Sequence, residues 1–307
     1  MKKRIKKQVR KCILDYRFNP RDDGFQSGKK LFFVTGRGKS GTTWLAHLLG
    51  SHPSLFCDPT ENFGFHQDFR FDYLASCQEM LYDRLRDHLN NKTWKLIKNG
   101  LITNLITKCN KISAQRLGDK TPDQDLSRIF GCFPETKAVV ILRDFRDTCV
   151  SWAFHVARRT GKWEGLFDGP DGRNLDNDLL RAMLTYYAKK QDFACYSGFV
   201  SDRPEQVAMV RYEDMKRDLA ATLKGVFSFL GVDSTDALVK NCIQANTFEK
   251  SAGGRRPGQE DAGSFVRKGI TGDWRNHFSP QNVETFKEIA GDMLIAAGYE
   301  KDDQWGL

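Results

Sequence analysis

A glycine-rich stretch near the N-terminus, residues 31–47 (LFFVTGRGKSGTTWLAH), most constrains what this chain can fold into. It begins with an apolar run typical of a buried strand, breaks at three glycines, and continues with the apolar spacing of a helix. Glycines let successive backbone N–H groups converge, and the N-terminus of a helix carries a positive partial charge. The order of strand, glycine-rich turn and helix therefore predicts a loop that binds a phosphate-like anion.

This loop differs from the nucleotide-binding loop of kinases and ATPases. Their pattern G-x-x-x-x-G-K-[ST] would need a glycine at position 33, where the chain has Phe33, so residues 38–40 (GKS) match only its end. Lys39 and the hydroxyls of Thr42 and Thr43 add further anion donors. The alternative interpretation is that the glycines only form a tight turn between strand and helix.

Composition is that of a globular protein with an acidic partner. The 307 residues are 40% hydrophobic and 12% aromatic, which is enough to fill the core of one large domain. The net charge of +9 favours nucleic acid, a membrane surface, or a multiply charged cofactor or substrate. The eight cysteines are scattered without a C-x-x-C pair, which predicts reduced thiols, a cytoplasmic location and no zinc site.

The first 18 residues are strongly basic. They lack the apolar core of a signal peptide, and no later stretch has the length of a membrane-spanning segment. Ile5, Val9 and Ile13 follow helical spacing, so a weak peripheral contact with anionic lipid is one interpretation and a solvated extension is the other. We expect an N-terminal extension over 1–29, one domain over 30–299 and a short tail over 300–307.

Strands and helices alternate along the rest of the chain. Short strands are predicted within 114–123, ending in GDK, and within 137–144 and 206–214. Helical spacing is found over 72–110, 147–159, 175–196 and 280–297, and loops are predicted at 166–174 and 251–273. This alternation predicts an α/β fold: a single domain whose central, mostly parallel sheet is flanked by helices.

The strand within 137–144 ends in Arg143. A magnesium-dependent phosphoryl enzyme usually has an acidic residue there, so Arg143 indicates a cation that faces the ligand, and no metal is expected. Asp144 and Asp147 are expected to cap the following helix. Ser151 lies two turns beyond Arg143 on the same side, so the two residues could bind one phosphate. The alternative is an arginine that caps backbone carbonyls and a serine that faces solvent.

The loop over 251–273 is glycine-rich, polar and long for a connection inside a domain, which suggests a functional loop. Arg267, Lys268 and Gly269 place two cations beside a flexible residue. A mobile basic loop without a ligand is the alternative.

Together these segments resemble the sulfotransferases that use 3′-phosphoadenosine 5′-phosphosulfate (PAPS). The resemblance covers about residues 30–297 and depends on KSGTTWL (39–45), ILRDFRDTCVSWAFH (141–155), RYEDM (211–215) and RKGITGDWRNHF (267–278). It implies a sulfotransferase fold related to P-loop NTPases, PAPS as donor, 3′,5′-ADP as product, and a hydroxyl or amine acceptor. No metal would be needed, because a sulfuryl group bears less charge than a phosphoryl group.

The resemblance also implies roles for individual residues. Lys39 would stabilise the oxygen that leaves the sulfur, Arg143 and Ser151 would bind the 3′-phosphate, and Trp44 would pack on the adenine. For Trp44 and Phe248, ordinary core packing is the alternative. The donor-binding residues implied in this way are Arg37, Lys39, Ser40, Gly41, Thr42, Thr43, Trp44, Arg143, Ser151, Tyr212, Phe248, Arg267, Lys268 and Gly269.

The general base departs from the cytosolic pattern. Cytosolic small-molecule members have a histidine after a Lys-Thr pair, but here Lys120-Thr121 is followed by proline. Carbohydrate-type and many bacterial members use a glutamate in an acidic and aromatic loop, which TENFGFH (60–66) resembles. Glu61 is therefore the first candidate base, with His66 as the second catalytic candidate. Asp119 and His155 are further candidates for the base. For Glu61, the alternative is a loop carboxylate that only pairs with a nearby cation.

Two other classes of protein are alternatives. A P-loop phosphotransferase acting on a small metabolite would need a magnesium carboxylate and the standard loop spacing. A non-catalytic nucleic-acid-binding protein would need exposed aromatic residues among the basic ones. Neither pattern is found, so nucleic acid is not expected as a partner.

The acceptor and the assembly stay open. Alcohol, phenol, sugar, lipid and peptide hydroxyls or amines all fit the sequence. The dimer motif of cytosolic members falls on Arg275, Ser279, Pro280 and Glu284, where proline removes a backbone donor and disfavours that dimer.

Overall fold

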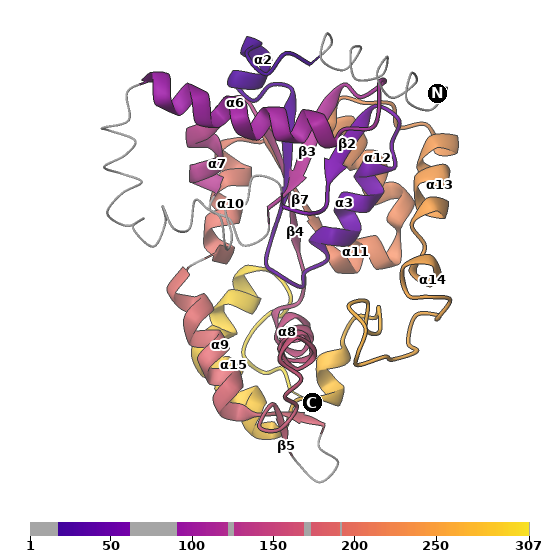
Figure 1. The fold of residues 1–307 in the computed structure, drawn as a ribbon. Coiled ribbons are helices and arrows are strands. Elements are labelled where there is room, and N and C mark those ends of the chain that lie inside the picture. Colours follow the sequence, from indigo (N-terminus) through magenta and orange to yellow (C-terminus); the bar gives the residue numbers. More distant parts are fainter. Residues whose placement is uncertain (1–17, 62–90, 122–125, 169–172, 191, 307) are drawn as a thin grey trace.

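A parallel sheet lies at the centre of the protein (Figure 1), whose computed structural model describes residues 18–61, 91–121, 126–168, 173–190 and 192–306. The strands run in the spatial order β2-β3-β1-β4-β7, and all the neighbouring pairs are parallel. Their bounds are β1 (Leu31–Thr35), β2 (Leu55–Asp58), β3 (Arg116–Lys120), β4 (Lys137–Leu142) and β7 (Val207–Arg211). This confirms the predicted α/β class and the strand predictions at 31–34, 114–123, 137–144 and 206–214.

Helices and one small hairpin complete the described fold. The helices are α2 (Asp23–Gln26), α3 (Thr42–Gly50), α6 (Asn91–Lys108), α7 (Leu126–Cys132), α8 (Phe145–Thr160), α9 (Asn177–Lys190), α10 (Asp192–Asp202), α11 (Tyr212–Arg217), α12 (Leu219–Leu230), α13 (Asp236–Ala245), α14 (Phe248–Ser251), the 3-10 helix η1 (Asp273–Asn276) and α15 (Pro280–Ala296). The hairpin pairs β5 (Phe167–Asp168) with β6 (Asn174–Leu175).

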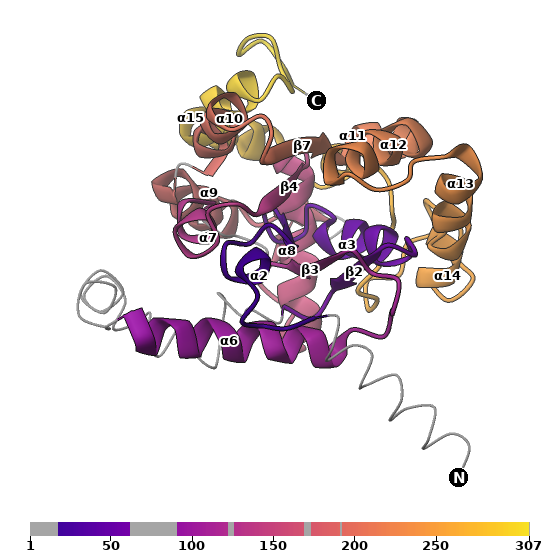
Figure 2. The ribbon, with the colours of Figure 1, turned by 90° about the horizontal axis from the view of Figure 1, so that it is seen from above.

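Both faces of the sheet are covered by helices, as Figures 1 and 2 show. Along β1, Leu31 and Phe33 pack in a core with α2, α6, α7 and α10, whereas Phe32 and Val34 pack in a second core with α3, α11, α12 and α13. All four side chains are fully buried. Because successive side chains of a strand point to opposite faces, one continuous apolar run serves both cores.

A third core lies beyond the carboxyl ends of the strands, where α8, α9, η1 and α15 meet. Trp274 is fully buried there, and Trp305 packs against it with ring centroids 5.9 Å apart. The segment that follows α15 therefore contributes to the core.

The helical region predicted over 175–196 is helical in α9 and α10, which the structure describes on either side of residue 191. The prediction for Asp147 needs correction. Asp147 does not cap α8: Asp144 is the N-cap, and its carboxylate accepts a hydrogen bond from the backbone N–H of Arg146. The carboxylate of Asp147 binds a distant loop instead.

Several predictions fall outside the described residues. They concern the basic segment before residue 18 and the first part of the helical region predicted over 72–110. Cys57, Cys149 and Cys242 are free and buried. No helix in the described ranges is both long enough and apolar enough to span a membrane.

Candidate functional site

The glycine-rich loop between β1 and α3 has the geometry of an anion-binding turn. Gly36 and Gly41 have φ angles of 142° and 105°, and Lys39 has a φ of 71°, unusual for a residue with a side chain. A Cβ on Gly36 would overlap the carbonyl oxygen of Ile141, so only glycine fits where the loop crosses β4. No side chain caps the N-terminus of α3 after Gly41, which leaves its first N–H groups for a ligand.

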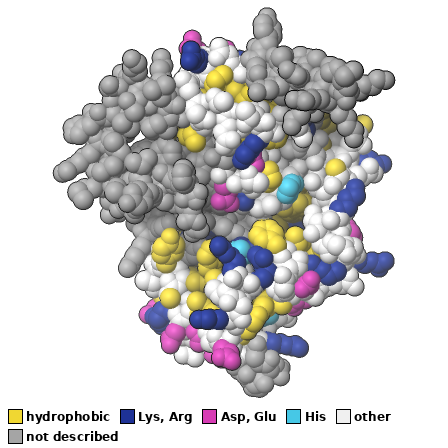
Figure 3. Space-filling model, in the orientation of Figure 1, with side chains coloured by type: hydrophobic (Ala, Val, Ile, Leu, Met, Phe, Trp, Pro, Cys, Tyr) yellow, Lys and Arg dark blue, Asp and Glu magenta, His cyan; other side chains and the backbone are white. Residues whose placement is uncertain are grey.

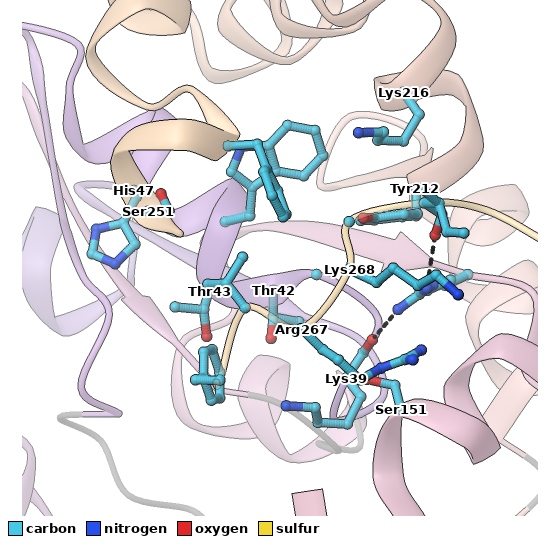
Figure 4. Close-up of a pocket in the computed structure, with 18 residues that line it drawn as sticks. Lys39, Thr42, Thr43, His47, Ser151, Tyr212, Lys216, Ser251, Arg267 and Lys268 are labelled. Atoms are coloured by element: carbon cyan, nitrogen blue, oxygen red, sulfur yellow. Dashed lines mark hydrogen bonds between the residues drawn. The ribbon is translucent and has the colours of Figure 1, made fainter. Parts of the chain in front are cut away.

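A cavity of about 370 Å³ opens at this loop (Figure 4). In Figure 4, Lys39 and Ser151 lie toward one end of the cavity, and Lys216 lies toward the opposite end. The wall includes most of the donor-binding residues predicted from the sequence: Lys39, Gly41, Thr42, Thr43, Trp44, Arg143, Ser151, Tyr212, Phe248, Arg267, Lys268 and Gly269. These residues come from the carboxyl ends of β1, β4 and β7 and from the late loop, as is usual for ligand sites in open parallel sheets.

Arg37 and Ser40 are the two predicted donor-binding residues that do not line the cavity. The guanidinium carbon of Arg37 lies 3.3 Å from the centroid of the Phe145 ring, and only 4% of the residue is exposed. Ser40 is 1% exposed, and its backbone N–H donates to the carbonyl of Arg37. Both residues are therefore buried under the glycine-rich loop and support it without reaching the cavity.

Arg143 connects three parts of the site. Its Nη1 donates to the carbonyl of Lys39 at 3.2 Å, its Nη2 donates to the carbonyl of Ile270 at 3.1 Å, and it lies 3.6 Å from the carboxylate of Asp147. Burial alone would lower the pKa of Arg143, but the neighbouring groups Tyr212 and Asp147 outweigh it and raise the pKa. Its Nε is buried and has no hydrogen-bond partner among the described residues.

Asp147 fastens the late loop to α8. Its carboxylate accepts hydrogen bonds from the backbone N–H groups of Gly272 at 2.8 Å and Trp274 at 2.9 Å. This contact joins residues more than a hundred positions apart and sets where the loop passes the cavity.

Arg267 and Lys268 share the buried carboxylate of Asp273. Lys268 lies 2.7 Å from it, and Arg267 forms ion pairs with both Asp273 and Glu260. Burial would raise the pKa of Asp273, but hydrogen bonds from His277 and Lys268 and the charge of Arg267 lower it well below its usual range. The two cations therefore line the cavity with part of their charge already compensated.

Aromatic rings form the other end of the cavity. Trp44 and Tyr212 meet edge to face with ring centroids 5.7 Å apart. The ring of Phe248 lies against Gly269, where any Cβ would overlap it and where φ is 67°. These three rings offer apolar surfaces to a flat base.

Lys39 projects into the cavity without a carboxylate partner among the described residues. Its Nζ lies 4.0 Å from the centroid of the Phe265 ring. Burial and the charges of Arg158 and Arg143 lower the pKa of Lys39 to about 8. An anion beside Lys39 would stabilise its charged form.

Glu61 lies at the edge of the site and not on the cavity wall. Its carboxylate is 2.8 Å from the Nζ of Lys120, which also donates to the hydroxyl of Thr43 at 3.2 Å. The backbone of Glu61 has a φ of 60°, and 34% of its side chain is exposed. Thr43 is on the wall, so Lys120 links Glu61 to the cavity.

The other candidate bases differ in how they are placed. His66 is outside the described residues, and Asp119 is fully buried in β3. Burial and the charges of Lys39 and Arg158 lower the pKa of His155 to about 4, so its imidazole is neutral at pH 7. Its Nδ1 accepts a hydrogen bond from Arg158 at 2.9 Å, which places the remaining proton on Nε2.

The sequence interpretation missed six wall residues: His47, Lys216, Ser251, Phe265, Val266 and Ile270. Helical spacing contained a signal for two of them. His47 follows Thr43 by four positions on α3, and Lys216 follows Tyr212 by four on α11, so each shares a helix face with a predicted residue. Phe265 precedes Arg267 by two positions in the loop. Across the part of the chain that the structure describes, no three His, Cys, Asp or Glu side chains are grouped as a metal site would require.

Comparison with known proteins agrees with this fold and site. The family model described as "Sulfotransferase domain" matches residues 29–298, so the chain belongs to the sulfotransferase domain family. The predicted resemblance and the sulfotransferase fold are confirmed.

The relatives are distant. Flavonol 3-sulfotransferase of Flaveria bidentis is 27% identical over 179 residues, which are 53% of this chain and 56% of that protein. Sulfotransferase 1C2 of Homo sapiens is 32% identical over 93 residues, 27% of this chain and 31% of the relative. The chain thus spans about half or less of these two relatives. Cytosolic sulfotransferase 16 of Arabidopsis thaliana is 25% identical over 326 aligned positions, 95% of this chain and 84% of the relative.

Among solved structures, mouse sulfotransferase SULT7A1 complexed with PAP has a TM-score of 0.59. It is 18% identical, and the match covers 90% of both chains. At this identity the likeness shows a shared fold.

Proposed function

We propose that the protein transfers the sulfuryl group of PAPS to a hydroxyl or amine of a small acceptor. The observation that carries this proposal is one cavity that is lined both by several cations and by aromatic rings. Lys39 lies at the glycine-rich loop, and Arg143 lies with Ser151 beside the late loop. PAPS carries a phosphosulfate and a second phosphate at two separate positions, joined by an adenosine.

Arg143 and Ser151 would hold the 3′-phosphate. Nη1 and Nη2 of Arg143 each bind one backbone carbonyl, and each carries a second N–H that could bind the phosphate. Arg267 and Lys268 would add charge from the late loop, and Trp44, Tyr212 and Phe248 would contact the adenine. The Asp147 contact keeps this loop close enough to take part.

The phosphosulfate would lie over the N-terminus of α3. Backbone N–H groups of the loop and the hydroxyls of Thr42 and Thr43 would orient it, and Lys39 would place its positive charge on the oxygen that leaves the sulfur. The donor supplies a sulfuryl group whose transfer develops charge on that oxygen. We propose a metal-independent transfer, because the cations and N–H groups of the loop can stabilise this charge.

Glu61 is our proposed general base. Its ion pair with Lys120 connects it to Thr43 on the cavity wall, beside Lys39. His155 is a weaker candidate in this geometry, because its Nε2 already carries a proton and its Nδ1 is bound by Arg158. His66 is kept as a second catalytic candidate from the sequence.

We propose a cytoplasmic location and no nucleic-acid partner. Cys57, Cys149 and Cys242 are buried free thiols, which fits a reducing compartment. The cations of the site lie at strand ends and on loops around one cavity, not along an extended basic surface.

A thermal-shift comparison of three ligands tests the proposed donor. We expect 3′,5′-ADP to raise the melting temperature, whereas ATP with magnesium and a single-stranded oligonucleotide should have little effect. Stabilisation by ATP with magnesium alone would support a phosphotransferase and contradict the proposal. Stabilisation by the oligonucleotide alone would favour a nucleic-acid-binding protein.

A further inference from the structure

Helix α8 carries a cation that the proposed donor does not use. Ser151, His155 and Arg158 follow one another at helical spacing, so they share the side of α8 that begins at the cavity. Ser151 lines the cavity, and Arg158 lies two turns beyond it. Figure 3 shows Lys and Arg side chains gathered with hydrophobic ones over α8 on this face of the molecule.

Arg158 and Lys39 approach the same aromatic ring. The Nζ of Lys39 is 4.0 Å from the centroid of Phe265, and the guanidinium carbon of Arg158 is 5.6 Å from it. Phe265 is 50% exposed. A molecule lying on this ring would reach the neighbourhood of both cations.

Among the described residues, the charge of Arg158 is not compensated by a carboxylate. Four other cations at or beside the site do face a carboxylate: Arg143 faces Asp147, Arg267 and Lys268 face Asp273, and Lys120 faces Glu61. Lys39 faces none of the described carboxylates, and the proposed donor accounts for its charge. Among the described residues, no carboxylate lies within ion-pair distance of Arg158. Its hydrogen-bond partner is the Nδ1 of His155, at 2.9 Å.

His155 therefore positions Arg158 without neutralising it. Its imidazole is neutral at pH 7, and it lies 5.4 Å from Trp152 and 6.3 Å from Phe265, measured between ring centroids. Holding a bare cation beside Lys39 is costly, since like charges repel at close range. An anion on a ligand would offset this cost.

We propose that the acceptor carries an anionic group, of the carboxylate or sulfonate type, that binds Arg158 while the body of the acceptor lies on Phe265. The nucleophilic hydroxyl then faces Lys39 and the sulfur. This inference rests on the proposed function, in which Lys39 binds the donor and Arg158 is left for the acceptor. It narrows the open list of acceptors to hydroxy acids and their sulfonate analogues.

Binding to the complex with 3′,5′-ADP tests this without a need for turnover, because the nucleotide occupies the donor site. Isothermal titration compares matched pairs on that complex: 4-hydroxybenzoate with 4-hydroxybenzamide, 4-hydroxybenzenesulfonate with its sulfonamide, and 4-hydroxybutanoate with its amide. We expect at least one acid to bind about tenfold or more tightly than its neutral partner, the size of one charge-assisted contact. Arg158→Gln should remove this preference, and Arg158→Lys should keep part of it.

Arg159→Gln is the matched control, because Arg159 is the neighbouring, exposed arginine of α8. It should leave the preference unchanged. The proposal would be overturned if each acid bound no more tightly than its neutral partner, or if no acid bound at all. It would also be overturned if the preference for the acid survived Arg158→Gln, because a cation other than Arg158 would then bind the acid. Failure of the wild-type protein to bind 3′,5′-ADP would instead contradict the proposed function. The experiment thus distinguishes a failure of the proposed function from a failure of the acceptor proposal.

Discussion

Lys39 combines an unusual backbone conformation with a lowered pKa. Its φ of 71° costs about 1 kcal/mol for a residue with a side chain, and the carbonyl of Lys39 is held by Arg143. The same backbone turn directs its ammonium into the cavity, where burial and neighbouring cations lower its pKa to about 8. An anion that binds there would relieve the charge repulsion and offset the energetic cost of the backbone strain.

The lowered pKa of Lys39 predicts how nucleotide affinity depends on pH. Lys39 is protonated below pH 8 and loses its charge as the pH rises through 8, so affinity for 3′,5′-ADP should be nearly constant from pH 7 to 7.5 and should weaken above 8. The decline should be at most about tenfold per pH unit. Calorimetric titration measures it, and Lys39→Met should bind more weakly at pH 7 without a bend near 8. Matching pH profiles for both proteins would contradict the assignment.

Replacement of Glu61 by glutamine tests the proposed base. Loss of a general base lowers kcat by about 10²–10⁴-fold, whereas affinity for 3′,5′-ADP should not change, because Glu61 is not on the cavity wall. Initial rates with an acceptor found by a labelled-donor screen measure the effect, with the exposed Glu164→Gln as control. Near-normal turnover of Glu61→Gln, beside an inactive Lys39→Met, would assign the base to another residue.

At the scale of elements, β1, the glycine-rich loop and α3 could be predicted from the sequence. A continuous apolar run, three glycines and a helical pattern are local signals, and β4 and β7 are readable for the same reason. The role of Asp147 could not be predicted from the sequence, because Gly272 and Trp274 come into contact with it only in the folded chain.

Gly36 provides a test of the loop geometry. Gly36→Ala should destabilise the protein by more than about 2 kcal/mol and abolish binding of 3′,5′-ADP, because the new Cβ would overlap the carbonyl of Ile141. Gly161→Ala is a matched control: its φ of 70° is also positive, but nothing lies within 4 Å of its Cβ position. Urea denaturation and calorimetry measure both effects. Equal losses in the two variants would show that strain alone, and not the contact with β4, limits this position.

At the scale of the molecule, the site depends on a core formed late in the sequence. Trp274 lies next to Asp273, which holds Arg267 and Lys268. The guanidinium carbon of Arg146 lies 4.2 Å from the ring centroid of Trp274 and 4.6 Å from that of Trp305. The sequence places residues 300–307 outside the domain, and nothing in its local pattern predicts the burial of Trp305. Such packing depends on contacts between distant segments, which periodicity does not encode.

Removal of the Trp305 ring should therefore weaken both the fold and the site. Trp305 is 8% exposed, so Trp305→Ala should cost about 3 kcal/mol of unfolding free energy and weaken binding of 3′,5′-ADP through the late loop. Trp163→Ala, at a tryptophan that is 40% exposed, should cost less than about 1 kcal/mol. Chemical denaturation and nucleotide titration measure both variants. A stable Trp305→Ala protein with unchanged affinity would show that this core does not support the loop.

The most direct measurement of the central claim is formation of 3′,5′-ADP from PAPS in the presence of a metal chelator, with and without a mixture of hydroxyl and amine acceptors. We predict that the wild-type protein releases 3′,5′-ADP together with an equal amount of sulfated acceptor, and that Lys39→Met reduces both. Release that is independent of acceptors, dependent on added divalent metal, or unaffected by Lys39→Met would contradict the proposed sulfuryl transfer.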